Sequence, residues 1–198
     1  MNMLNTTEKK GENINIPNLL SFYRLLAFPL ILYFIIAGKE NLFSIFLVIN
    51  LLTDVADGFI ARRFKMETEL GARLDSAADN LTYLLAFAGI YAFKLEEFLP
   101  YKVSFLIFIG SLLFTIVVSL IKFRRLPSFH LYMTKISGYI QGAFFICLFT
   151  VGFIVPFYYF MIIWGISGAI EHITIQLIIP EMRSNVKGLY WVLKEKDI

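Results

Sequence analysis

Six apolar stretches, each long enough to cross a lipid bilayer, constrain this sequence more than any other feature. A hydrocarbon core of about 30 Å needs about 20 residues of helix. The chain is 58% hydrophobic and only 17% charged, so a soluble domain of 198 residues would leave much apolar surface in water. The stretches cover residues 17–37, 42–61, 72–93, 100–121, 136–154 and 155–179, and only Pro156 divides the last two.

Helices are expected for all six stretches, because backbone groups in lipid have no water to bond. An outer-membrane barrel would show short alternating segments instead. We therefore expect an all-α polytopic membrane protein with six transmembrane helices and one domain over residues 1–198. Residues 13–23 are expected to begin it as a short interfacial helix. The single cysteine, Cys147, excludes an internal disulfide.

Lysine and arginine residues are distributed unevenly between the two sides of such a bundle. Six spans place both termini on one side, and 14 of the 18 Lys and Arg residues lie there. The excess of positive charge predicts that both termini are cytoplasmic. The first apolar stretch is long and lacks a small-residue cleavage site, so we interpret it as a span of the mature protein. The Lys- and Ile-rich, cysteine-poor composition suits a bacterial plasma membrane.

Four aspartates interrupt the second and third spans. Asp54 and Asp57 are three residues apart and share a face of the second span, and Asp75 and Asp79 share a face of the third. Residues 63–70 connect the two spans, which must therefore be antiparallel. Both pairs should then lie at one level, about 6–12 Å inside the cytoplasmic boundary.

Carboxylates that face each other in this way cannot all stay ionised without partners. Arg62 could neutralise one of them. The remainder favour one or two hard divalent cations with oxygen ligands, Mg²⁺ or Mn²⁺. On the same faces Gly58, Ala61 and Gly71 leave room for a ligand to reach the cations, although small residues also allow close helix packing.

Residues 54–79 read D-x2-D-G-x2-A-R-x8-G-x3-D-x3-D, which resembles the signature of the CDP-alcohol phosphatidyltransferase family without a mismatch. Members of that family move a phosphatidyl-type group from a CDP-linked lipid to an alcohol and release CMP. The resemblance implies two cations per site with Asp54, Asp57 and Asp75 as ligands. It also implies that Asp79 contacts the second cation and acts as the base, and that the protein is a homodimer.

The same resemblance implies contacts to the CDP part of the lipid, here CDP-diacylglycerol. Gly58 and Arg62 match positions that contact it, whereas Ala61 and Gly71 match positions that leave space for it. Thr68, in the connecting loop, matches a position that contacts the nucleotide.

A second stretch, N-I-P-N-L-L-S-F-Y-R at residues 15–24 followed by Pro29, resembles one found in phosphatidylglycerophosphate synthases and their cardiolipin synthase relatives. Their pattern is N-I-P-N-x-L-T-x-x-R-x4-P, so Ser21 stands in place of Thr. The resemblance implies that Asn18 and Ser21 supply hydrogen-bonding groups near the CDP end, although both would also suit a helix start. Arg24 would be buried in the first span unless it meets a partner or a phosphate.

The remaining cytoplasmic cations are candidates for binding the acceptor alcohol. The densest group contains Lys122, Arg124, Arg125, His130 and Lys135. A guanidinium fork suits a phosphate, so a phosphorylated acceptor is favoured. Loops on this side are basic for reasons of topology in any case, which is the alternative explanation.

The stretch from Lys135 partly resembles the K-x-K-T-x-x-Q sequence of phosphatidylglycerophosphate synthases. Ser137 and Gly138 replace the second Lys and the Thr. The partial match favours glycerol 3-phosphate as the acceptor. The two replaced residues count against it, so inositol phosphate or another polar alcohol is the alternative.

Two other functions compete with the enzyme. A divalent-cation carrier also has carboxylates in its spans, but its sites lie near the midplane, often on broken helices in repeated halves. A degenerate relative would bind the nucleotide lipid without turnover, and an intact Asp79 argues against it. No nucleic-acid signature is present. In the sixth span, Glu171 and His172 are candidates for function because ionisable residues are costly in a membrane, and a structural pair of Glu171 with Arg24 or with His172 is the favoured alternative.

Overall fold

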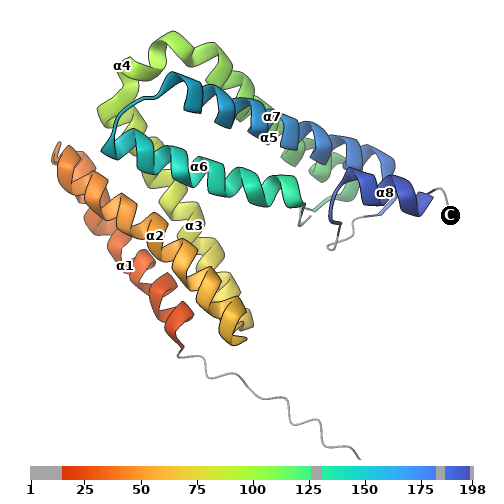
Figure 1. The fold of residues 1–198 in the computed structure, drawn as a ribbon, viewed down its shortest axis with the longest axis horizontal. Coiled ribbons are helices and arrows are strands. Elements are labelled where there is room, and N and C mark those ends of the chain that lie inside the picture. Colours follow the sequence, from red (N-terminus) through yellow and green to blue (C-terminus); the bar gives the residue numbers. More distant parts are fainter. Residues whose placement is uncertain (1–14, 126–130, 182–185, 197–198) are drawn as a thin grey trace, which may run out of the picture. The chain divides into compact units, whose positions relative to one another are not determined.

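The computed structural model describes residues 15–125, 131–181 and 186–196, and every regular element in these ranges is a helix, as expected (Figure 1). In chain order the elements are α1 (Ile16–Ile36), α2 (Glu40–Phe64), α3 (Glu69–Gly89), η1 (Ile90–Lys94), α4 (Leu95–Phe98), η2 (Leu99–Tyr101), α5 (Lys102–Phe123), α6 (Tyr132–Thr150), α7 (Val155–Ile178) and α8 (Leu189–Lys196). The chain divides into two compact units, Met1–Leu95 and Glu96–Ile198.

Long apolar helices make this a multi-pass membrane protein. Four stretches in the described residues are long and apolar enough to cross a membrane: Ile16–Ile36, Glu40–Phe64, Glu69–Phe123 and Val155–Ile178. The third is 55 residues long and contains α3 to α5, so it joins two predicted spans. Helix α6 is not among the four, since Lys135 and Gln141 lower its hydropathy. The predicted count of six spans is therefore not confirmed.

In the first unit α1 packs against both α2 and α3, and the three helices lie side by side (Figure 1). The residues that α1 buries recur every three or four positions: Pro17, Asn18, Ser21, Arg24, Ala27, Ile31 and Phe34. This spacing places them on one helix face. The half of the face near the start of α1 is largely polar, and the other half is apolar. From Ile16 onward the segment forms the first turns of α1, not the separate interfacial helix that was expected.

Local signals determine where these three helices begin and end. Asn15 caps α1, since its side chain accepts a hydrogen bond from the backbone N–H of Asn18 at 2.9 Å. Lys65 adopts a left-handed conformation, with φ of 54°, and ends α2. Thr68 caps α3, because its Oγ1 accepts a hydrogen bond from the N–H of Gly71 at 2.9 Å. The short connection between these caps brings the end of α2 close to the start of α3.

In the second unit α7 packs against α5, α6 and α8. The ring of Tyr158 is fully buried, and its hydroxyl lies 2.9 Å from Oγ of Ser104. Five aromatic rings have centroids 5.2–6.1 Å from that of Tyr158: Phe98, Tyr101, Phe144, Phe153 and Tyr159. Aromatic pairs at such distances contribute about 0.5–1.5 kcal/mol each beyond the area they bury, so this cluster stabilises one end of the unit.

Two charged side chains in the second unit bind helix ends. Nζ of Lys122 donates to two carbonyl oxygens in the last turn of α7, at 2.8 and 2.9 Å. A cation is favourable there because the last carbonyls lack helical partners and the helix dipole is negative. Oε1 of Glu171 accepts a hydrogen bond from the N–H of Leu189, at 2.9 Å, where α8 begins. The interpretation of Glu171 as a partner of Arg24 is wrong, since Arg24 pairs with other carboxylates.

Candidate functional site

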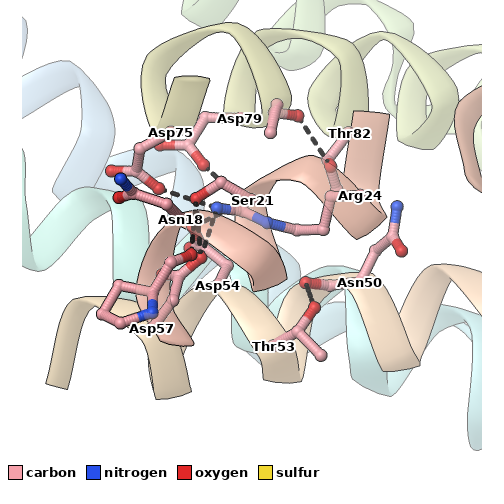
Figure 2. Close-up of polar contacts among 12 residues, drawn as sticks. Asn18, Ser21, Arg24, Asn50, Thr53, Asp54, Asp57, Asp75, Asp79 and Thr82 are labelled. Atoms are coloured by element: carbon pink, nitrogen blue, oxygen red, sulfur yellow. Dashed lines mark hydrogen bonds and ion pairs between the residues drawn. The ribbon is translucent and has the colours of Figure 1, made fainter. Parts of the chain in front are cut away.

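All four predicted aspartates meet around one guanidinium group, that of Arg24 in α1 (Figure 2). Nη1 of Arg24 donates to Oδ1 of Asp54 and to Oδ1 of Asp79, both at 2.7 Å. Nη2 donates to Oδ2 of Asp57 at 2.8 Å and to Oδ1 of Asp75 at 2.7 Å. Three helices therefore contribute to one cluster of charged side chains.

Each Nη atom joins one aspartate of α2 to one of α3. Asp54 and Asp79 share Nη1, and they lie ten residues from the ends of α2 and α3 that the connection joins. Asp57 and Asp75 share Nη2 and lie seven and six residues from those ends. The predicted convergence of the two pairs at matching levels is confirmed.

The charges of this cluster do not balance. The side chain of Arg24 is fully buried, and that of Asp57 is 3% exposed. One guanidinium cannot neutralise four carboxylates, so the cluster stays negative when all four are ionised. The expectation that Arg62 supplies the neutralising charge is wrong, because Arg24 supplies it. The guanidinium of Arg62 instead lies over Gly58, with its nitrogens 3.2 and 3.3 Å from where a Cβ would be.

Ser21 adds a polar contact to the most buried aspartate. Its Oγ lies 3.1 Å from Oδ2 of Asp57 and 3.3 Å from the carbonyl oxygen of Pro17. The oxygen of Asp57 that Arg24 binds is thus also within reach of a hydroxyl donor. This aspartate is held by two side chains of α1.

Three of the aspartates form a donor set that could hold a metal ion. One carboxylate oxygen from each of Asp54, Asp57 and Asp75 lies within 4.8 Å of the other two. Carboxylate oxygens are hard ligands and suit Mg²⁺, Mn²⁺ or Ca²⁺ better than soft metals. Asp79 is connected to this set through Nη1 of Arg24, which it shares with Asp54. The residues therefore fit a hard divalent cation.

A pocket opens beside these carboxylates, near the connection between α2 and α3. Its lining includes all seven residues predicted to contact the CDP part of a lipid or to leave space for it: Asn18, Ser21, Gly58, Ala61, Arg62, Thr68 and Gly71. Asp57 and Asp75 belong to the same lining, so the pocket reaches the acidic cluster. Four further lining residues were not predicted from the sequence: Pro17, Met66, Glu67 and Ala72. Nothing in their residue types separates them from ordinary loop and helix residues.

Hydrogen bonds tie the start of α1 to the wall of this pocket. Nδ2 of Asn15 donates to the carbonyl oxygen of Met66 at 3.0 Å, and Nδ2 of Asn18 donates to Oγ1 of Thr68 at 3.1 Å. A Cβ at Gly71 would collide with Oδ1 of Asn18 and lie 2.8 Å from Oγ1 of Thr68. Both interpretations of Gly71 are therefore compatible with the structure, since it lines the pocket and also allows α1 to approach α3 closely.

The residues predicted to bind the acceptor lie in the second unit. Arg124, Arg125 and Lys135 are exposed. Arg124 ends α5 in a left-handed conformation, with φ of 54°, and the carbonyl oxygen of Arg125 accepts a hydrogen bond from Ser119 at 2.8 Å. His130 lies outside the described residues. The role of this group in binding an acceptor stays a prediction.

Fold and site together define a helical, multi-pass membrane protein with an acidic cluster beside a polar pocket. The family model for CDP-alcohol phosphatidyltransferases matches residues 14–174, which is most of the chain. The chain belongs to this family, and the predicted resemblance is confirmed.

Relatives from bacteria and eukaryotes match parts of the chain. The CDP-diacylglycerol--glycerol-3-phosphate 3-phosphatidyltransferase of Aquifex aeolicus is 42% identical over 89 residues, which cover 44% of this chain and 49% of that protein. A cardiolipin synthase (CMP-forming) / mitochondrial hydrolase fusion protein of Schizosaccharomyces pombe is 35% identical over 123 residues, 59% of this chain and 19% of that protein. The human cardiolipin synthase (CMP-forming) is 30% identical over 115 residues, 57% and 37% of the two chains. The chain thus spans less than half the length of each of these relatives. No solved structure gives a significant match.

Proposed function

We propose that this protein moves a phosphatidyl group from CDP-diacylglycerol to an alcohol within the membrane and releases CMP. The observation that carries the proposal is the position of the four aspartates beside a pocket lined by every residue predicted to contact CDP. Relatives of this chain are named for phosphatidyl transfer from CDP-diacylglycerol or for CMP-forming synthesis of cardiolipin, and these names support the same reaction.

In this proposal the pocket holds the cytidine diphosphate part, and the acyl chains stay in the lipid. Arg62 is exposed at the pocket wall and offers a guanidinium to a phosphate. Asn18 of α1 and Thr68, the residue that caps α3, add polar groups to the same lining. Gly58 and Gly71 add no side chains to the lining, so a diphosphate can come close to the carboxylates.

We further propose two Mg²⁺ or Mn²⁺ ions per site, held by Asp54, Asp57 and Asp75, with Asp79 on the second ion. The oxygen donor set of the first three supports this assignment. Bound cations would neutralise the diphosphate and stabilise charge on the attacking and leaving oxygens.

The reaction is a substitution at phosphorus. The acceptor hydroxyl oxygen forms a bond to the phosphatidyl phosphorus, and the bond from that phosphorus to the oxygen of CMP breaks. CMP leaves with the electron pair, and Asp79 takes the hydroxyl proton as general base. The remaining work of the residues is positioning and charge stabilisation, as in other phosphoryl transfers.

Glycerol 3-phosphate is the acceptor that we propose, with Arg124, Arg125 and Lys135 as candidates for binding its phosphate. The name of the Aquifex aeolicus relative supports this choice. Inositol phosphate is the second candidate, because Ser137 and Gly138 stand where phosphatidylglycerophosphate synthases have Lys and Thr.

We also propose that the two units act as one membrane domain and that the protein is a homodimer. It lies in a bacterial plasma membrane in this proposal, with both termini in the cytoplasm. The family match extends across both units and supports a single functional domain. A C-terminal reporter that is active only in the cytoplasm tests the orientation, and cross-linking in the membrane tests the dimer.

Release of CMP is the direct test of the proposed reaction. Purified protein in nanodiscs receives CDP-diacylglycerol, Mg²⁺ or Mn²⁺, and one acceptor from a panel of glycerol 3-phosphate, inositol phosphate, serine and choline. We expect CMP with glycerol 3-phosphate, loss of release with a chelator and recovery on adding the cation back. Absence of CMP with every acceptor would refute the transferase. Mn²⁺ flux into protein-loaded liposomes would then favour the cation carrier.

A further inference from the structure

Arg24 makes contacts that the proposed chemistry does not use. Its guanidinium binds one oxygen of each of the four aspartates at 2.7–2.8 Å, and its side chain is fully buried. No other lysine or arginine in the described part of the chain pairs with any of the four. The same carboxylates that fit a divalent cation are therefore already joined by a cation of the protein itself.

A guanidinium at this position and a divalent cation compete for the same groups. Asp54, Asp57 and Asp75, whose oxygens form the donor set for a metal ion, each accept a hydrogen bond from Arg24. Two cations a few ångströms apart also repel each other strongly where water is scarce. In addition, Oδ1 of Asp79 is bound by Nη1 of Arg24, so an oxygen of the proposed base is engaged as a hydrogen-bond acceptor.

We propose that Arg24 is a positioning residue that holds the four carboxylates together and gives up its contacts when divalent cations bind. This inference rests on the proposed metal-dependent function. It makes cation binding an exchange: Arg24 keeps the like-charged aspartates on neighbouring helices assembled, and the cations replace it. Arg24 thus lowers cation affinity while it raises the stability of the protein without cations.

Asn50 offers a place for the released guanidinium. It lies one helical turn before Asp54 in α2, so the Asn50 and Asp54 side chains share a face. Asn50 is 1% exposed, and neither its Oδ1 nor its Nδ2 has a hydrogen-bond partner in the described structure. Nε of Arg24 is likewise buried without a partner. A buried amide oxygen without a donor is costly, and a guanidinium would satisfy it.

The first test measures Mn²⁺ binding without any substrate, by the loss of the free-ion signal in electron paramagnetic resonance. Arg24→Gln removes the competing charge, and we expect Mn²⁺ to bind about tenfold more tightly or better than to the unaltered protein. Arg24→Lys keeps the positive charge but lacks the forked guanidinium, and it should bind Mn²⁺ with an intermediate affinity. The matched control is Arg73→Gln, which removes an exposed arginine of the same unit whose ion pair in the described residues is with Glu69. It should leave the affinity within twofold.

The second test compares thermal unfolding with and without Mg²⁺. In chelator, Arg24→Gln should unfold at a lower midpoint temperature than the unaltered protein. Adding Mg²⁺ should raise the midpoint of Arg24→Gln by more than it raises the midpoint of the unaltered protein. A purely structural Arg24 would lower both midpoints equally. The proposal would be overturned if Mg²⁺ raised the midpoints of both proteins equally, or if Arg24→Gln bound Mn²⁺ more weakly than the unaltered protein.

Two further measurements keep the proposal testable if Arg24→Gln does not fold. In the unaltered protein labelled with ¹⁵N-arginine, the guanidinium signal missing from Arg24→Lys should change its chemical shift when Mg²⁺ is added, because its hydrogen-bond acceptors change. An unchanged signal would refute the exchange. Asn50→Leu removes the receiving amide, so Mn²⁺ affinity should fall while stability in chelator does not. Because none of these readouts involves CMP, the exchange and the transferase reaction can fail independently.

Discussion

Replacing Gly71 by alanine should lower stability, although alanine is the better helix former. The added Cβ would collide with Oδ1 of Asn18 and lie 2.8 Å from Oγ1 of Thr68. Both atoms must move, so α3 loses its cap and the hydrogen bond from Asn18 to Thr68 breaks. The lost cap costs about 1 kcal/mol and the lost hydrogen bond about 1 kcal/mol. Alanine returns up to about 1 kcal/mol of helix propensity, which leaves a net loss of about 1 kcal/mol.

Thermal unfolding in detergent, followed by circular dichroism, measures this loss. For a chain of this length, about 1 kcal/mol corresponds to a midpoint about 2–4 °C lower. The matched control is Gly110→Ala in α5, where no atom lies within 4 Å of the added Cβ. It should leave the midpoint unchanged or raise it by a few degrees.

A double variant identifies Asn18 as the cause. When Asn18→Ala removes the colliding oxygen, Gly71→Ala should cost about 1 kcal/mol less than it costs alone, because residues in contact are not additive. Equal midpoints for Gly71→Ala and Gly110→Ala would refute the reasoning. A full cost of Gly71→Ala in the Asn18→Ala background would also contradict it.

Three further variants separate the roles of individual side chains. Asp79→Asn should reduce CMP release about 10²–10⁴-fold, the range typical for loss of a general base, and should leave the unfolding midpoint unaltered. Activity within tenfold of that of the unaltered protein would show that Asp79 is not the base. Thr68→Val deletes the hydroxyl that caps α3 and should lower the unfolding midpoint by about 2–4 °C; no change in the midpoint would show that the cap contributes little. Lys122→Met removes the ammonium that binds the end of α7 and should lower the midpoint without raising the KM for glycerol 3-phosphate. A raised KM with an intact midpoint would instead assign Lys122 to the acceptor.

Much of the site could be predicted from sequence because its spacing is local. Helical periodicity alone places Asp54 with Asp57 and Asp75 with Asp79 on shared faces. A connection of a few residues then brings both faces to one level, and the structure confirms this. The pocket residues near that connection follow for the same reason.

The number of spans was less predictable because helix ends in this chain do not coincide with changes in hydropathy. The region from Glu69 to Phe123 stays helical through a short π-helix and a 3₁₀ turn. Hydropathy divides it into two spans, whereas backbone hydrogen bonding continues across the boundary. Conversely, α6 is a full helix of 19 residues whose polar positions lower its mean hydropathy.

What the sequence determined by itself is the helical character of the chain and the faces that carry carboxylates, since both depend on residues a few positions apart. The tertiary structure decided which cation those carboxylates meet. Arg62 is near Asp57 along the chain, whereas Arg24 lies in another helix, and periodicity does not reveal how α1 is rotated against its neighbours. Packing of α1 between α2 and α3 buries Arg24 among all four aspartates and leaves Arg62 at the pocket wall. A charge that is removed from water must find its partners inside the protein, and only the arrangement of the three helices supplies them.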